Sequence, residues 1–123
     1  MVRKHIQLAI SALISLIFSL GLIQGSLAGD LKAIAVLVPE QGTDYGWNQQ
    51  GVDAARAVAE KHGLEFMPAE GLGYGDVRPT LRELAEDGAG LMIAHASGYN
   101  TAAPEIAKET GVPVAIVDTP EGL

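Results

Sequence analysis

The sequence predicts an α/β fold with a doubly wound, open parallel sheet, and three observations support this fold class. Four short apolar runs alternate with three helical patterns, in the order β-α-β-α-β-α-β. The apolar runs are nearly continuous, which is typical of strands that are buried on both faces of a parallel sheet. Crossovers between parallel strands are almost always right-handed, so this order winds the helices onto the sheet in a doubly wound arrangement.

The four strands are expected within residues 32–38, 64–67, 91–94 and 112–117. The second run is short. Successive runs begin about 20–30 residues apart, which is the length of one strand–helix unit.

The first helix is expected from about Gly46 to His62. Gly63 follows at the position where helices commonly end in a left-handed residue. The side chains expected to face the sheet are Val52, Ala55, Val58 and Ala59.

The other two helices also have clear boundary signals. One begins after Asp76, a good N-cap, accepts Pro79 in its first turn and ends at Gly88. The last begins after Asn100 or Thr101 and ends at Gly111. The first of these helices has an apolar stripe of Leu81, Leu84 and Ala85, and the residues expected to be buried in the second are Ala103, Ile106 and Ala107.

Residues 1–28 have the pattern of a cleaved export signal. Arg3 and Lys4 precede an apolar stretch over residues 6–23, and the small residues Ser26 and Ala28 fit the positions before a signal-peptidase site. We therefore expect cleavage after Ala28 and an extracytoplasmic mature chain, residues 29–123. A retained membrane anchor is the alternative. Since the chain has no cysteine, neither a lipid-anchored cysteine nor a disulfide is expected.

Charge excludes one large class of partners. The net charge is −7, and beyond the two basic residues of the leader the chain carries six basic and 15 acidic side chains. Nucleic acids need a basic face, so no nucleic-acid partner is expected. His62 and His95 lie on different elements, which gives a metal site little support, and no cofactor is predicted.

Ligands of open α/β sheets bind outside the carboxyl ends of the strands. The loops expected there are residues 39–47, 69–76, 95–101 and 118–121. The first loop offers Asp44, as a helix cap or a ligand-binding carboxylate, and Trp47, as a packing residue or a flat wall against a ring. Asn48 is either a solvent-facing residue at the helix start or an amide for the edge of a heterocycle.

The remaining loops carry weaker signals. The glycine-rich stretch 71–76 lacks the pattern of a phosphate-binding loop and is interpreted as a flexible turn that ends in a helix cap. His95 and Ser97 allow a hydrolase hypothesis, but no nucleophile elbow surrounds the serine. A hydroxyl-rich binding loop is the preferred interpretation. Asp118 is either a turn residue or a contact with a ligand or hinge.

The first loop and helix, Asp44-Tyr45-Gly46-Trp47-Asn48-Gln49-Gln50-Gly51 after Val36-Leu37-Val38-Pro39, resemble the basic membrane protein family, also called PnrA-like. The segments 81–85 and 91–95 also resemble this family, and the likeness extends from about Lys32 to Asp118. Members are substrate-binding proteins of ABC importers, and characterised members bind purine nucleosides.

The resemblance implies a periplasmic-binding-protein type I fold, with residues 29–123 as part of its first lobe. It further implies a small-molecule ligand and an ABC permease as partner, without catalysis. The ligand-binding residues that it implies are Asp44, Trp47, Asn48, Ser97, Tyr99 and Thr101. Many members have an aspartate near the position of Thr101. Because the family is about three times longer, we expect this chain alone to bind ligand weakly.

Two other functions remain open at this stage. The first is an extracytoplasmic α/β hydrolase that uses His95 and Ser97. The second is the ligand-sensing domain of a signalling receptor.

Overall fold

The computed structural model describes residues 31–118. The predicted leader at residues 1–28 and the last five residues, 119–123, lie outside the described residues. The elements are β1 (Ala33–Leu37), α2 (Trp47–His62), β2 (Glu65–Ala69), α3 (Arg78–Glu86), β3 (Leu91–Ala94), a 3₁₀ turn η1 (Ser97–Tyr99), α4 (Ala102–Thr110) and β4 (Val114–Ile116).

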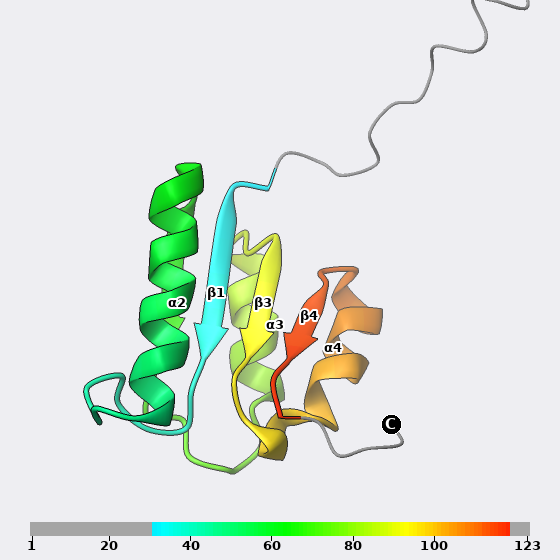
Figure 1. The fold of residues 1–123 in the computed structure, drawn as a ribbon. Helices are drawn as coiled ribbons and strands as arrows, with labels where there is room; N and C mark the ends of the chain where they lie inside the picture. Colours follow the sequence, from blue (N-terminus) through cyan, green and yellow to red (C-terminus); the bar gives the residue numbers. More distant parts are fainter. Residues whose placement is uncertain (1–30, 119–123) are drawn as a thin grey trace, which may run out of the picture.

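The four strands form one parallel sheet in the order β2-β1-β3-β4. β1 lies in the interior between β2 and β3, with Ile34 opposite both Phe66 and Leu91. The carboxyl ends of the strands therefore meet at one edge of the sheet, the lower edge in Figure 1. The predicted fold class, an α/β doubly wound parallel sheet, is confirmed.

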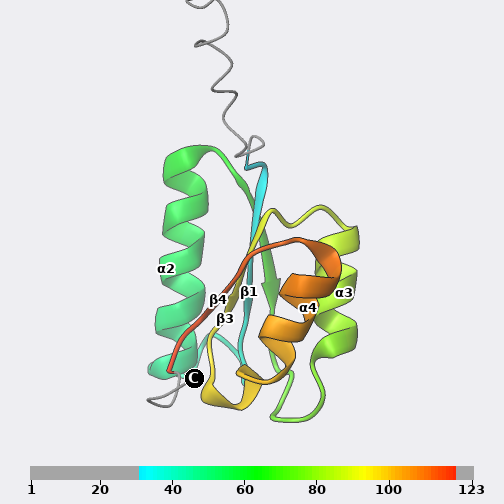
Figure 2. The ribbon, with the colours of Figure 1, turned by 90° about the vertical axis from the view of Figure 1, so that its right-hand side faces the viewer.

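The helices cover the two faces unequally. α2 packs against β1 and β2 on one face, while α3 and α4 pack together on the other (Figure 2). The right-handed crossover rule accounts for this division. The connection from β1 to β2 runs in one direction along the sheet, and the connections from β2 to β3 and from β3 to β4 run in the other.

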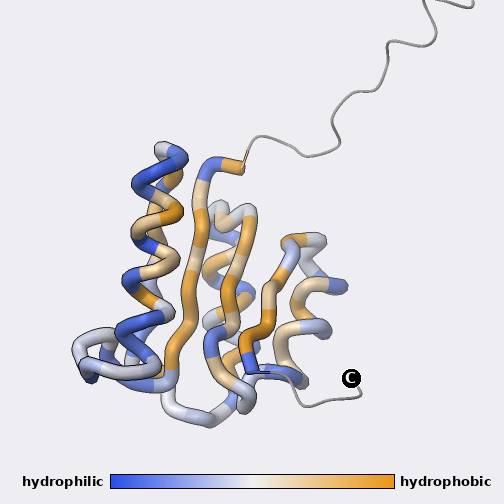
Figure 3. The backbone as a smooth tube through the Cα atoms, in the orientation of Figure 1, coloured by the Kyte–Doolittle hydropathy of each residue, from blue (hydrophilic) through white to orange (hydrophobic). Residues whose placement is uncertain are grey.

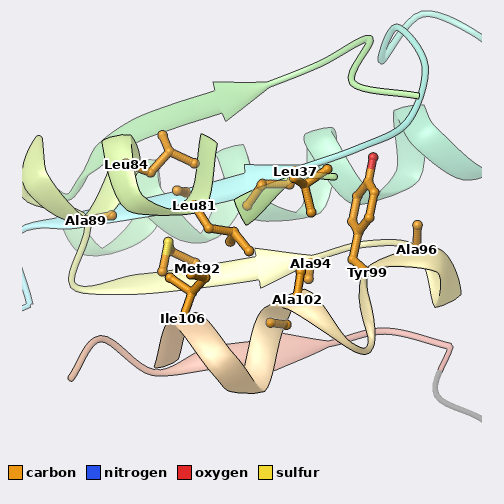
Figure 4. Close-up of a cluster of buried hydrophobic side chains, with 13 residues drawn as sticks. Leu37, Leu81, Leu84, Ala89, Met92, Ala94, Ala96, Tyr99, Ala102 and Ile106 are labelled. Carbon is orange, nitrogen blue, oxygen red and sulfur yellow. The ribbon is translucent and has the colours of Figure 1, made fainter. Parts of the chain in front are cut away.

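The larger core lies between the sheet and the pair α3–α4. Leu81, Met92 and Ile106 are fully buried there, together with the Tyr99 ring (Figure 4). The core on the α2 face is smaller and contains Val36, Val38, Val52 and Ala55. Hydropathy follows the same arrangement, since the strands are apolar and the outer side of α2 is polar (Figure 3).

The helix boundaries confirm the sequence signals. Gly63 and Gly111 have left-handed backbone angles, with φ of 64° and 75°, and they end α2 and α4. Asp76 was expected to be the N-cap of α3, but Val77 holds that position. The side chain of Asp76 lies one residue earlier and accepts a hydrogen bond from the backbone N–H of Arg78, the first residue of α3.

Three details of the predicted burial are wrong. Val58 is 45% exposed although its helical position was expected to face the sheet, and Ala107 is only partly buried. The strands were expected to be buried on both faces, but this holds for β1 alone, since β2 and β4 keep exposed positions. The reason is that β2 and β4 lie at the edges of the sheet and α2 does not cover β3 and β4.

Candidate functional site

The loop after β1 is organised around Asp44. Its carboxylate accepts hydrogen bonds from the backbone N–H groups of Gly46, Asn48 and Gln49 and from the side-chain amide of Asn48, at 2.7–3.2 Å. Together these hydrogen bonds hold the pKa of the Asp44 carboxyl well below its usual range. The bond from the Asn48 side-chain amide has the largest effect. Asp44 therefore caps α2 as an anion.

Asn48 joins this cap to the end of β1. Its side-chain oxygen accepts a hydrogen bond from the backbone N–H of Glu40 at 3.4 Å, while its amide nitrogen donates to Asp44 at 2.7 Å. Asn48 is only 7% exposed, so the interpretation as a solvent-facing residue at the helix start is wrong. Its side-chain amide thus links Glu40, near the start of the loop, to the Asp44 cap.

Trp47 is held by His95 from the loop after β3. The two rings stack with centroids 4.5 Å apart and an interplanar angle of 24°. The Trp47 indole N–H donates to the His95 carbonyl at 3.2 Å, and the His95 Nε2–H donates to the Trp47 carbonyl at 2.9 Å. Trp47 nevertheless remains 45% exposed. Its indole is therefore a fixed surface with free aromatic area.

This arrangement requires a glycine at position 51. A Cβ atom on Gly51 would lie 2.5 Å from Cδ2 of His95, closer than any real contact of this kind. Because Gly51 has no side chain, the His95 imidazole can lie directly against α2. There it supports the indole of Trp47, which is one helical turn before Gly51.

The loops after β2 and β3 are also joined. The Tyr99 hydroxyl donates to the Gly73 carbonyl at 2.7 Å, and burial raises the pKa of Tyr99 to about 12. A Cβ atom on Gly98 would lie 2.9 Å from the Tyr74 ring, which shows that this ring lies against the glycine backbone. Tyr74 itself is mostly exposed.

A cavity of about 370 Å³ opens at this edge of the sheet. Its lining comes from the loops after β1, β2 and β4 and from the first turn of α2: Glu40, Trp47, Asn48, Tyr74 and Asp118. Asp118 has a left-handed backbone conformation with φ of 66°. The cavity thus lies outside the carboxyl ends of the strands, where open α/β sheets bind ligands.

Two further hollows lie beside α2. One, of about 410 Å³, is bounded by Tyr45, Gly46, Gln49, Gln50 and Asp53, all from a single loop and helix. The other is a mainly apolar groove of about 540 Å³ between α2 and the strands β3 and β4, with Val58, Ile93 and Val117 in its walls. The cavity at Trp47 differs from both because three separate loops supply its polar and aromatic groups.

Comparison with known proteins supports the fold. A solved structure, the ABC transporter system solute-binding protein from Conexibacter woesei, is similar with a TM-score of 0.61 and 18% identity over 74% of this chain. This chain therefore shares its α/β fold with part of a solute-binding protein. This chain covers 30% of that protein. No protein-family model matches the sequence, and no curated protein matches it either.

The six predicted site residues are distributed unevenly around the cavity. Trp47 and Asn48 line it, and Asp44 is bonded to Asn48. Ser97 and Thr101 are exposed on η1 and at the start of α4, outside the lining. Tyr99 has 0% exposure, so in this structure it contributes by holding Gly73 instead of by offering a free surface.

Sequence reasoning missed Glu40 and Tyr74 as lining residues and left Asp118 open. One signal could have identified Tyr74, namely a large aromatic residue between glycines at the end of a strand. Glu40 had no comparable signal.

The hydrolase hypothesis predicts that His95 and Ser97 share a hydrogen bond. Within residues 31–118, the hydrogen bonds of the His95 side chain and carbonyl connect it to Trp47, and none connects it to Ser97.

In the described part of the chain, no three His, Asp or Glu side chains gather as metal ligands would. None of the helices between residues 31 and 118 is long and apolar enough to cross a membrane.

Proposed function

We propose that this chain is the extracytoplasmic solute-binding component of an ABC importer and that it captures a small, polar, ring-bearing molecule at the edge of the sheet next to Trp47. The observation that carries the proposal is the cavity at the carboxyl ends of the strands, with a half-exposed indole fixed by His95 in its wall. A rigid aromatic surface beside a few convergent polar groups is typical of small-molecule sites.

The similarity to the solute-binding protein from Conexibacter woesei supports this role. We further propose that the chain belongs with the basic membrane protein, or PnrA-like, group, on the residues 44–51 that resemble its first helix. A membrane permease would then receive the solute. Purine nucleosides are the first solutes to test.

In this proposal residues 1–28 direct export and are removed, and residues 29–123 supply part of the first lobe of a two-lobed cleft. A single lobe contacts a ligand from one side only, whereas small-molecule sites bury about 70–90% of the ligand. We therefore expect dissociation constants in the millimolar range for this chain alone. A sub-micromolar dissociation constant by calorimetry would contradict this expectation.

Trp47 provides a direct test because it is the only tryptophan in the chain. Its indole N–H gives a single resonance in a ¹H–¹⁵N NMR spectrum. Titration of the exported chain with a panel of nucleosides, nucleobases and ring-bearing amines should include members that shift this resonance saturably, together with the backbone resonances of Glu40, Tyr74 and Asp118.

Trp47→Ala should abolish saturable binding. Since this variant has no indole, binding is followed by the backbone resonances of Glu40, Tyr74 and Asp118. Tyr45→Ala is the matched control, because Tyr45 is an exposed aromatic residue of the same loop outside the cavity, and it should leave binding unchanged. A panel without any binding member, or shifts that cluster away from the cavity, would contradict the proposed function.

A further inference from the structure

The cavity at Trp47 has an uneven distribution of charge. Two of its five lining side chains, Glu40 and Asp118, are carboxylates, and both are exposed at the rim. The other lining groups are the uncharged amide of Asn48 and the aromatic rings of Trp47 and Tyr74. Among residues 31–118, no lysine, arginine or histidine side chain contributes to the lining.

The lysine and arginine side chains of residues 31–118 lie outside this lining. Lys32 precedes β1, and Lys61 and Lys108 are in the last turns of α2 and α4, at the opposite edge of the sheet. Arg56 stacks over the Phe66 ring. Arg78 and Arg82 form ion pairs with Asp76, Glu105 and Glu109.

The N-termini of the three helices lie at this edge of the sheet, and that of α2 supplies Trp47 and Asn48 to the lining. Such a terminus ordinarily attracts anions. Here the carboxylate of Asp44 already accepts the free N–H groups of Asn48 and Gln49. The helix terminus is thus neutralised from within the chain. An anionic ligand would meet the carboxylates of Glu40 and Asp118, and the N–H groups of Asn48 and Gln49 would not be available to compensate.

The aromatic side chains of the lining also favour one charge. His95 stacks on the Trp47 indole, yet Trp47 remains 45% exposed and lines the cavity. The faces of aromatic rings carry negative potential and attract ammonium and guanidinium groups, and tryptophan does so most strongly. Both the rings and the carboxylates in this cavity therefore favour positive charge.

We infer that the solute bound at this cavity is a small organic cation, in which an amino or ammonium group meets Glu40 and Asp118 while its ring or apolar part lies against Trp47 and Tyr74. This inference rests on the proposed function and specifies the chemical class of its solute. It also excludes phosphorylated and carboxylated solutes from this site.

Three probes with the same phenyl ring and different charge test the inference: phenethylammonium, 2-phenylethanol and phenylacetate. Each is titrated into the exported full chain at low ionic strength, and the indole N–H resonance of Trp47 is followed by NMR. The ammonium compound should bind at least tenfold more tightly than the alcohol, and the carboxylate should not bind measurably. Raising the salt concentration to about 0.5 M should remove most of this preference, because salt screens exposed charges.

The double variant Glu40→Gln/Asp118→Asn should bind the ammonium compound and the alcohol equally. The matched control is Asp53→Asn, an exposed carboxylate outside this cavity, and it should keep the preference for the cation.

The outcomes separate this inference from the proposed function. If the alcohol or the carboxylate binds as tightly as the ammonium compound, or if the double variant keeps the preference, the site binds solutes but the inferred charge is wrong. If none of the three probes shifts the Trp47 resonance, the inference fails, and failure of the nucleoside panel at the same resonance then overturns the solute-binding role as well.

Discussion

The two faces of the sheet differ in how completely they are covered. On one face, α3 and α4 pack together and enclose a continuous core that includes Leu81, Met92 and Ile106. On the other, α2 covers β1 and β2 only, and an apolar groove of about 540 Å³ remains beside it. The comparison separates two roles, because the closed face supplies most of the buried apolar contacts while the open face carries the helix that positions Trp47.

The largest effect is expected on the closed face. Leu81 has 0% exposure, and Leu81→Ala should lower the free energy of unfolding by about 3 kcal/mol, since it removes buried methyl groups and leaves a cavity. Urea unfolding followed by circular dichroism measures this loss. Leu81→Met keeps the volume and should cost less than about 1.5 kcal/mol. Equal losses from the two variants would show that this face is not tightly packed.

The open face offers a matched pair on one helix. Val52 is buried against β1, whereas Val58 is half exposed at the groove. Val52→Ala should lower the free energy of unfolding by roughly 2 kcal/mol, and Val58→Ala should change it by less than about 0.5 kcal/mol. The same urea measurement applies. A loss of equal size at Val58 would mean that the groove is covered in solution.

Gly51→Ala tests how the open face supports the candidate site. Glycine in a helix interior is ordinarily unfavourable by about 1 kcal/mol relative to alanine, so this change would stabilise most helices. Here the added Cβ atom meets the His95 ring at 2.5 Å, and we expect a loss of about 1–3 kcal/mol instead. The emission of Trp47 should change at the same time, since its stacking partner moves.

The control for this variant is Gly75→Ala, because nothing lies within 4 Å of a Cβ atom at that glycine. It should leave both the stability and the tryptophan emission unchanged. A stabilised Gly51→Ala variant with unaltered emission would contradict the proposed support of Trp47 by His95.

The smallest effect concerns the cap of α2 and depends on pH. The folded-state pKa of Asp44 is lowered, so its contribution to stability is present above its unfolded-state pKa of about 4 and is lost as the pH falls through the folded-state value. Asp44→Asn should therefore be less stable than the parent chain at pH 5–7, and this difference should shrink below about pH 4. Urea unfolding at several pH values measures it, with Asp53→Asn as the control.

Local sequence signals predicted much of the framework. Gly63 and Gly111 marked the ends of two helices because glycine reaches left-handed angles without steric cost. Asp44 was correctly considered as a cap, since an acceptor near a helix start binds free N–H groups. The exposure of Val58 could not be predicted, because helical periodicity identifies an apolar stripe but does not show how far the sheet extends beneath it.

By itself the sequence determined the strand and helix order and the parallel sheet, and so the edge at which the loops after the strands meet, because these depend on local periodicity and on the handedness of crossovers. Only the tertiary structure decided that Glu40, Tyr74 and Asp118 join Trp47 around one cavity and that Tyr99 is buried behind it. These groups come from separate loops, and their distances depend on the packing of the whole sheet.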